Sequence, residues 1–511
     1  MQKRAAAGSG GMVTAEVSVM TRDGRARRIV LALVGALCVA LPFFFVRFPP
    51  VTDLPQHLAQ VRLFLDAVAH PQGAYRIQWF TPYSLVYGLL GLAWACCGPV
   101  NAGRVGLIGL GLLWVGATHL LAAERRRAPE AALLAALLFF SPILYWGFLS
   151  FAIGWPAFLL WFAMTTGRAA PVFTWRQSVL LLGGAVLLYV SHVLWFAAGM
   201  AWLVLHSIVF RVPWRVAAWR LASVSPVLVA TAVWYPHLAA RGFVSPTVWL
   251  TTPTAHLSFS WLAYAAVGGL VGATKYVMFG TLVGWIALSA WQHRDSFWGR
   301  VDRELLLAGA FCGACALLFP YKHMNTVEFA ERWMPPALAL LVLAVPAPLL
   351  TPSRLRVGVC AVAAIFSLWI ALAWTRFERT ELSGLAQALA ALPDAQRVLG
   401  LDFLKKSAVV DNLPFLQLVA YAQVLHGGTL YLSFADFAPS LVVFKERRRA
   451  RWTADLEWEA ERVQPSDFQY FDFAIIGGGP QVHERYTALP TLTPVTRDGL
   501  WRLYRIRQAA Q

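Results

Sequence analysis

Charged side chains are scarce in this sequence. Asp, Glu, Lys and Arg make up 14% of the 511 residues, whereas hydrophobic residues make up 58%. Soluble domains usually carry about 25% charged residues, so this composition excludes a soluble protein. A helix needs about 20 apolar residues to cross the hydrocarbon core of a bilayer, and residues 29–375 contain about a dozen such stretches. The sequence therefore predicts an all-α, polytopic membrane bundle.

Carboxylates are scarcer still in the bundle. Only nine of the 26 Asp and Glu residues lie between positions 29 and 375, and 15 follow position 375. This scarcity limits the possible active sites of the bundle.

Residues 376–511 are long enough for one small globular domain. Their patterning predicts an α/β domain, with helices near 380–392, 411–426 and 445–462 and strands near 397–401, 470–476 and 501–506. Gly477–Pro480 lacks the spacing of a nucleotide-binding loop and is expected to be a turn.

Cysteine is also sparse. All six cysteines lie in apolar segments and none lies in the C-terminal domain, so no disulfide framework is predicted. Cys312 and Cys315 have C-x-x-C spacing, but they are expected to be packing residues because no His or acidic residue adjoins them. The basic segment 1–28 precedes an apolar run without a small-residue cleavage site, which predicts an uncleaved first span rather than a signal peptide.

The net charge of +17 comes mainly from Arg residues in short loops, a pattern typical of membrane topology rather than nucleic-acid binding. The apolar stretches are 29–46, 82–98, 104–123, 130–146, 148–166, 177–192, 194–210, 221–236, 274–291, 304–320, 333–349 and 356–375. If all twelve crossed from a cytoplasmic N-terminus, 11 Lys and Arg residues would lie inside and 16 outside. If 82–98 is interfacial or re-entrant, the split becomes 19 inside and eight outside, which satisfies the positive-inside rule.

This second topology predicts about eleven crossings. Residues 1–28 form a cytoplasmic basic tail, 29–375 form the transmembrane domain with a first outer loop at 47–103, and 376–511 form a C-terminal domain on the outer face. Because the elaborated loops all face outward, the protein is expected to work on that side.

Four carboxylates of the bundle face outward in this topology: Asp53, Asp66, Glu328 and Glu331. Asp53 follows the first span in a Pro-stiffened segment. The alternative interpretation makes Asp53 an N-cap, with Gln56 as its N3 partner. The stripe formed by Leu58, Val61, Leu65 and Val68 predicts an amphipathic helix lying on the membrane.

The overall layout resembles the GT-C superfamily of membrane glycosyltransferases. The resemblance covers the first span, the acidic residue in the early outer loop, the many further spans and the C-terminal outer domain. Further segments are similar to bacterial members of that group: Trp146–Gly154, Tyr189–His192, Glu331–Arg332, Phe471–Ile476 and Trp501–Arg505. Family members commonly have two acidic residues in the early loop, whereas this chain has Asp53-Leu54.

The resemblance implies an inverting transfer of a hexose or pentose from a polyprenyl-phosphate donor to a glycan or lipid acceptor. Asp53 would be the catalytic carboxylate that deprotonates the acceptor hydroxyl, and a divalent metal stays an open possibility. Lys322, His323 and Arg332 would bind the departing phosphate. His57, His192, Glu328 and Glu331 are the further candidate substrate-binding residues. The partners would be this donor, the acceptor and membrane lipids, and the location a bacterial inner membrane.

Two other functions remain open, a transporter or flippase for lipid-linked glycans and a noncatalytic assembly subunit. Ion-coupled transporters usually carry ionisable residues within their spans. The interiors of the predicted spans contain no carboxylate and only Lys275 near an edge, which disfavours coupled transport but not passive flipping. Snorkelling or headgroup contact is the alternative role for Lys322, His323 and Arg332, and simple packing is the alternative for the histidines.

Overall fold

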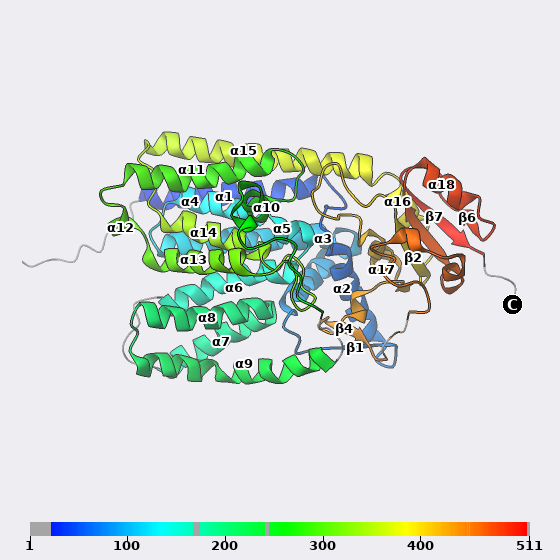
Figure 1. The fold of residues 1–511 in the computed structure, drawn as a ribbon, viewed down its shortest axis with the longest axis horizontal. Helices are drawn as coiled ribbons and strands as arrows, with labels where there is room; N and C mark the ends of the chain where they lie inside the picture. Colours follow the sequence, from blue (N-terminus) through cyan, green and yellow to red (C-terminus); the bar gives the residue numbers. More distant parts are fainter. Residues whose placement is uncertain (1–21, 167–173, 241–244, 447, 449, 508–511) are drawn as a thin grey trace, which may run out of the picture.

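The computed structural model describes residues 22–166, 174–240, 245–446, 448 and 450–507. The long helices lie along one axis and form a bundle, and the C-terminal domain sits at one end of it (Figure 1). The helices of the bundle are α1 (Arg22–Ala40), α2 (Leu54–Ala69), α3 (Leu85–Glu124), α4 (Pro129–Ala136), α5 (Pro142–Trp146), α6 (Leu149–Thr166), α7 (Trp175–Ser191), α8 (Val193–Val209), α9 (Trp214–Ala240), α10 (Phe259–Val267), α11 (Thr274–Gln292), α12 (Phe297–Arg300), α13 (Arg303–Leu318), α14 (Met334–Ala344) and α15 (Pro352–Arg376).

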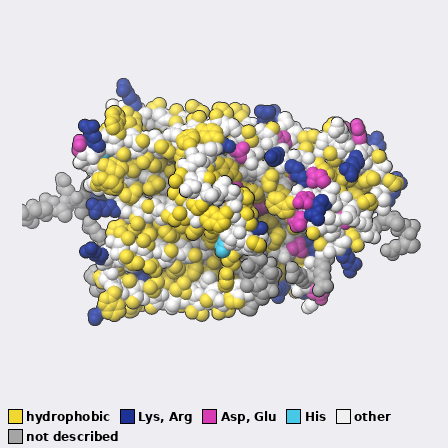
Figure 2. Space-filling view, viewed as in Figure 1, with side chains coloured by type: hydrophobic (Ala, Val, Ile, Leu, Met, Phe, Trp, Pro, Cys, Tyr) yellow, Lys and Arg dark blue, Asp and Glu magenta, His cyan; other side chains and the backbone are white. Residues whose placement is uncertain are grey.

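Among the residues that the structure describes, six helical segments are long and apolar enough to cross a membrane. They are Gly24–Phe44, Leu85–Glu124, Pro129–Trp146, Leu149–Thr166, Trp214–Pro236 and Pro352–Glu381. Hydrophobic side chains cover the visible face of the bundle, and Lys and Arg gather at the end away from the C-terminal domain (Figure 2). The chain is therefore a multi-pass membrane protein, whereas the expected count of eleven crossings stays a prediction.

Helix α3 contains a sharp kink at Gly98, whose φ is 71°, followed by Pro99. A Cβ on Gly106 would lie 2.6 Å from the Leu90 side chain, and one on Gly109 would lie 3.2 Å from Leu89. Residues 16 positions apart in a straight helix are separated by about 24 Å, so the two halves must fold back against each other. The first half of α3 thus ends at Gly98, which is also the end of the stretch 82–98 that the sequence predicted not to cross the membrane.

The C-terminal domain is built on a five-stranded sheet of order β3-β2-β5-β7-β6. The strands are β2 (Arg397–Asp402), β3 (Thr429–Leu430), β5 (Phe473–Gly477), β6 (Leu492–Pro494) and β7 (Trp501–Ile506). β2 is parallel to β3 and β5, whereas β7 is antiparallel to β5 and β6. The helices of the domain are α16 (Leu385–Ala390), α17 (Tyr421–His426) and α18 (Pro480–Thr487). The expected α/β character and the strands near 397–401, 470–476 and 501–506 are present.

The basic helix expected over 445–462 is wrong. In the described part of that range the only helical turn is Ala460–Arg462. Arg448 instead binds the carboxylate of Asp436 and donates to the carbonyl of Leu430 at 2.5 Å. Just before it, β4 (Val442–Phe444) pairs with β1 (Tyr75–Ile77) of the first outer loop. These tertiary hydrogen bonds override the local helix propensity of the segment.

The burial of helix α2 differs from its apolar stripe, and its expected place on the membrane surface stays a prediction. Leu65 and Val68 of that stripe are exposed, whereas Gln56 and Gln60 are buried. The Gln60 amide donates to the carbonyl of Val442 at 3.1 Å and accepts from its N–H at 2.8 Å. The helix is therefore enclosed between the bundle and the C-terminal domain, and its glutamines bind backbone groups of that domain.

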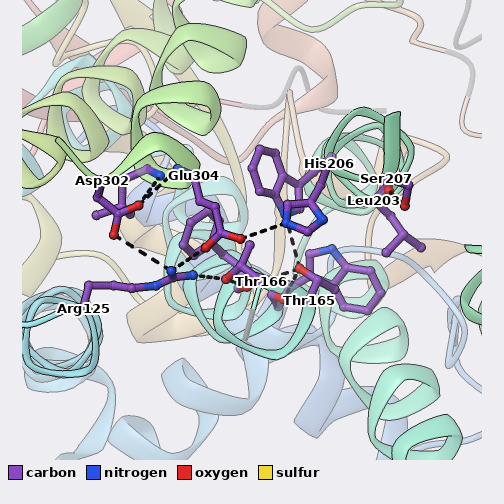
Figure 3. Close-up of polar contacts among 12 residues, drawn as sticks. Arg125, Thr165, Thr166, Leu203, His206, Ser207, Asp302 and Glu304 are labelled. Carbon is purple, nitrogen blue, oxygen red and sulfur yellow. Dashed lines mark hydrogen bonds and ion pairs between the residues drawn. The ribbon is translucent and has the colours of Figure 1, made fainter. Parts of the chain in front are cut away.

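A charged network closes the opposite end of the bundle (Figure 3). Arg125 at the end of α3 donates to Glu304 of α13 at 2.5 Å, and His206 of α8 contacts the other oxygen of that carboxylate at 2.9 Å. Asp302 caps α13 by accepting from two of its N–H groups. Glu304 therefore joins α3, α8 and α13. This is a packing role, consistent with its expected place away from the outer loops.

Candidate functional site

Asp53 is fixed by its main chain against the turn between α5 and α6. Its N–H donates to the carbonyl of Trp146 at 3.1 Å, and the N–H of Thr52 donates to that of Tyr145 at 2.9 Å. Gly147 follows with a φ of 83°, and a Cβ at this position would lie 2.7 Å from the backbone nitrogen of Asp53. Only glycine accommodates both this conformation and this approach. The first two residues of the Trp146–Gly154 segment, which the sequence singled out, therefore hold the backbone of Asp53 in place.

The carboxyl group of Asp53 does not cap α2. Asp53 occupies the N-cap position, but its side chain accepts no hydrogen bond from the helix. Burial raises the pKa of this carboxyl to about 7, an effect that the positive charge of Arg332 partly offsets. The geometry therefore disfavours the capping interpretation and leaves a partly exposed carboxyl group that titrates near neutral pH.

His57 is one helical turn beyond Asp53, as its spacing predicted, and its N–H donates to the Asp53 carbonyl at 3.0 Å. Its Nε2 lies 3.1 Å from the carbonyl oxygen of Gly147, which can only accept, so Nε2 carries the proton. Nδ1 then accepts from the Tyr87 hydroxyl at 3.0 Å. Burial lowers the pKa of His57 to about 4. The neutral ring uses both nitrogens within the protein and positions the Asp53 turn.

Arg332 is the cation at the centre of the site. Its Nε and Nη2 donate to the backbone carbonyl of Val327, at 3.2 and 2.5 Å, and its guanidinium lies 3.6 Å from the ring centroid of Phe148. Burial lowers the pKa of Arg332 to about 10, while the charges of Glu328 and Asp53 act to raise it. Arg332 therefore stays cationic, and its Nη1 makes no hydrogen bond to any described residue.

The carboxyl groups of Glu328 and Glu331 both act electrostatically on this cation. Glu328 accepts a hydrogen bond from the Tyr264 hydroxyl, and burial together with the charge of Glu331 raises its pKa to about 8. Burial raises the pKa of Glu331 to about 7. Neither carboxylate forms an ion pair with Lys322 or Arg332 among the described residues. Both carboxyl groups therefore interact electrostatically with Arg332, but neither forms an ion pair with it within 4 Å.

The loop that carries Glu328 is strained. Met324, Asn325 and Glu328 all have positive φ, between 47° and 59°. Non-glycine residues rarely adopt this conformation, which costs about 1–3 kcal/mol each when it is imposed by the surroundings. Such strain is typical of functional segments, and here it delivers Glu328 and Arg332 to the same region.

His192 lies in the same region, at the junction of α7 and α8. Its Nδ1 accepts from the N–H of Leu194 at 3.1 Å, and its ring packs against Tyr83 with a centroid distance of 4.7 Å. Because Nδ1 accepts this hydrogen bond it carries no proton, so the ring is neutral. Tyr83 also interacts electrostatically with Arg332. Sequence analysis missed Tyr83, and its only signal was an aromatic residue in the Thr-Pro-Tyr-Ser segment before α3.

The other two cations of this outer segment are placed differently. The backbone of Lys322 pairs with Val248, and Nδ1 of His323 lies 3.0 Å from the Thr247 hydroxyl. Neither side chain contributes to the electrostatic surroundings of Asp53 or Arg332. The structure thus brings together Asp53, His57, His192, Glu328, Glu331 and Arg332, and it leaves Lys322 and His323 at the loop edge.

A divalent metal would find few protein ligands in this arrangement. Within the ranges that the structure describes, no three His, Cys, Asp or Glu side chains lie close enough to hold a metal ion. The outer carboxyls interact with Arg332 and Tyr264 instead. No chemical step is therefore assigned to a metal.

Comparison with known proteins identifies the fold. No protein-family model and no curated protein sequence matches the chain. Its structure is similar to the crystal structure of ArnT from Cupriavidus metallidurans bound to undecaprenyl phosphate. The TM-score is 0.54 and the identity 13%, over 95% of this chain and 98% of that chain. The likeness extends over nearly the whole of both chains and confirms the expected GT-C fold.

Proposed function

We propose that this chain is a membrane glycosyltransferase that moves a hexose or pentose from a polyprenyl-phosphate donor to an acceptor hydroxyl. The fold it shares with a protein bound to undecaprenyl phosphate supports the donor class. The observation that carries the proposal is the site itself. A carboxyl group with a pKa of about 7 and a buried arginine face one region without forming an ion pair.

The chemistry follows from these two groups. The Asp53 carboxylate accepts the proton of the acceptor hydroxyl, whose oxygen forms a bond to the anomeric carbon of the sugar. The bond from that carbon to the phosphate oxygen breaks on the opposite face, and its electron pair leaves with the phosphate. Nη1 of Arg332 is available to donate to the departing phosphate, and a charged hydrogen bond stabilises the charge that develops there. The transfer inverts the anomeric configuration.

The remaining groups hold this arrangement. His57 and Gly147 fix the Asp53 turn, and Phe148 supports the Arg332 guanidinium from one side. Glu328 and Glu331 are proposed to contact sugar hydroxyl groups, since carboxyl groups with raised pKa values both donate and accept hydrogen bonds near neutral pH. His192 and Tyr83 complete the wall beside Arg332.

We further propose that the site faces the outside of a bacterial inner membrane. Arg27 at the start of α1 pairs with Glu130, and Arg127 donates to the carbonyl of Arg300. These arginines gather at the end of the bundle opposite the C-terminal domain, which supports a cytoplasmic N-terminus and an outer C-terminal domain, 376–511. A reporter fused after Gln511 should be active only if it requires the outer compartment, and activity of a cytoplasmic reporter would overturn this topology.

The function is tested by incubating the purified protein with a panel of polyprenyl-phosphate sugars and measuring released polyprenyl phosphate. The wild-type protein should release it from at least one sugar in the presence of acceptor, and Asp53→Asn should not. The flippase alternative predicts another outcome. In liposomes the protein would then move intact lipid-linked sugars across the bilayer without releasing polyprenyl phosphate, and Asp53→Asn would behave like the wild type.

A further inference from the structure

A polar cavity lies at the start of the first outer loop, where two candidate spans end. Its volume is about 510 Å³, and its wall includes Arg47, Arg104, Glu378 and Arg379. The candidate spans Gly24–Phe44 and Pro352–Glu381 both end at this wall. None of the residues assigned to the Asp53 site lines the cavity. The cavity is thus a separate feature at the level where the hydrocarbon core gives way to water.

The charge of this cavity is unbalanced. Three arginines face one carboxylate, and Glu378 already accepts a hydrogen bond from the backbone N–H of Arg47 at 2.7 Å. Among the described residues, no carboxylate oxygen lies within 4 Å of the guanidinium of any of these arginines. Glu378 acts electrostatically on Arg104 and Arg47, but one carboxylate does not balance three guanidinium groups, so the lining keeps an excess of positive charge.

The arginines differ in how firmly they are held. Arg104 donates to the carbonyl of Val46 at 3.3 Å and to the side chain of Asn101. Arg47 lies over the ring of Phe48 at 5.1 Å, which restricts its direction. Arg379 is exposed on the helical turn that follows α15. Arg104 is thus fixed by hydrogen bonds, whereas Arg47 and Arg379 are accessible. Such a set of guanidinium groups suits a phosphate, because each guanidinium can donate two parallel N–H bonds to phosphate oxygens.

The surroundings identify the source of that phosphate. Phe44 and Phe45, which also line the cavity, are 67% and 57% exposed at the end of the first span. Apolar rings that are exposed at the end of a membrane span contact lipid chains more favourably than water. A soluble anion would gain nothing from these rings, whereas a phospholipid would contact them with its chains while its phosphate reaches the arginines.

We propose that this cavity binds the phosphodiester headgroup of an anionic membrane phospholipid. The lining also includes Leu382, Ser383 and Gly384, which join the last span to the C-terminal domain. Gly384 is itself packed against the carbonyl oxygens of Asp498 and Trp501 in that domain. A bound headgroup would therefore connect the first span to this junction and hold the C-terminal domain against the bundle.

The test measures lipid retention by the full-length protein in detergent, using native mass spectrometry with added phosphatidylglycerol or phosphatidylcholine. The wild-type protein should retain phosphatidylglycerol in preference to phosphatidylcholine. Arg47→Gln/Arg379→Gln should weaken that retention at least tenfold. Arg485→Gln/Arg505→Gln removes the same two charges from exposed positions of the C-terminal domain and should retain phosphatidylglycerol like the wild type.

Three outcomes would overturn the proposal. The first is equal retention of the two lipids by the wild-type protein. The second is unchanged phosphatidylglycerol retention in the Arg47→Gln/Arg379→Gln variant. The third is displacement of the lipid by equimolar inorganic phosphate, which would indicate a site for soluble anions. If the double variant does not fold, Arg379→Gln alone, at an exposed position, should weaken retention severalfold, and unchanged retention would count against the proposal.

Discussion

Replacing Asp53 by Asn separates the catalytic role of this residue from its structural role. The turn that contains Asp53 is fixed by main-chain hydrogen bonds to Trp146 and from His57, and the side chain makes no capping hydrogen bond. Asn has nearly the same shape and cannot ionise. The substitution should therefore leave the backbone in place while it removes the group that accepts the proton.

The effect on stability has a definite sign. Burial raises the pKa of Asp53 from 3.8 to about 7, so ionisation of this group opposes folding. The cost is absent below the unfolded value of 3.8, grows as the pH rises towards 7, and is complete above it. A difference of about three pH units corresponds to about 4 kcal/mol as an upper limit. Asp53→Asn should thus be more stable than the wild type at pH 8, and the difference should disappear near pH 4.

The effect on activity should be opposite. Loss of the general base should reduce kcat by a factor of about 10² to 10⁴, and wild-type activity should rise through about pH 7 as Asp53 ionises. The assays are polyprenyl phosphate release over pH 5 to 9 and thermal unfolding of the same samples. Asp66→Asn is the matched control, since Asp66 lies on the same helix and pairs with Arg62 at the surface. An Asp53→Asn protein that keeps full activity would refute the assignment, and one that is less stable at pH 8 would refute the electrostatic argument.

Three further changes test the supports of the site. Gly147→Ala places a Cβ against the backbone of Asp53 in a left-handed conformation; it should lower stability by about 1–3 kcal/mol and activity further, and an unchanged unfolding temperature would contradict the close packing. Gln60→Leu leaves the N–H and carbonyl of Val442 unpaired, so trypsin should release the C-terminal domain faster, and an unchanged rate would count against this contact. Arg332→Ala should lower kcat/KM for the donor by a factor of about 10 to 100, since a charged hydrogen bond contributes about 1.5–3 kcal/mol. Lys322→Ala should not change it, and equal effects would return Lys322 to the site.

The sequence predicted elements whose signal is local. The strand near 501–506 alternates buried and exposed side chains over part of its length and is observed as Trp501–Ile506. The kink at Gly98-Pro99 lies where the apolar stretch 82–98 was expected to end, because both residues interrupt a helix. These features depend on the residues of one segment, so periodicity and breaker residues were sufficient to find them.

Elements that depend on distant partners were not predictable in this way. The buried face of α2 includes Gln56 and Gln60, whose partners lie more than 360 positions later in the chain. In a sequence, a polar residue that hydrogen-bonds to the backbone of another domain looks the same as one that faces water. The apolar stripe of α2 therefore indicated that Gln56 and Gln60 are exposed to solvent. Tyr83 was missed for the same reason, because only its packing against His192 and the charge of Arg332 connect it to the site.

The two ends of the bundle handle buried charge in opposite ways. At the end shown in Figure 3, both oxygens of Glu304 have cationic or imidazole partners, so desolvation of the carboxylate is offset within the protein. Around Asp53, an acid and an arginine act on each other without an ion pair. Burying charged groups without an ion pair lowers the stability of the fold. Such groups are typical of functional sites, where a ligand supplies the missing hydrogen-bond or charge partners. An acceptor hydroxyl beside Asp53 and a donor phosphate beside Arg332 would supply the two missing partners.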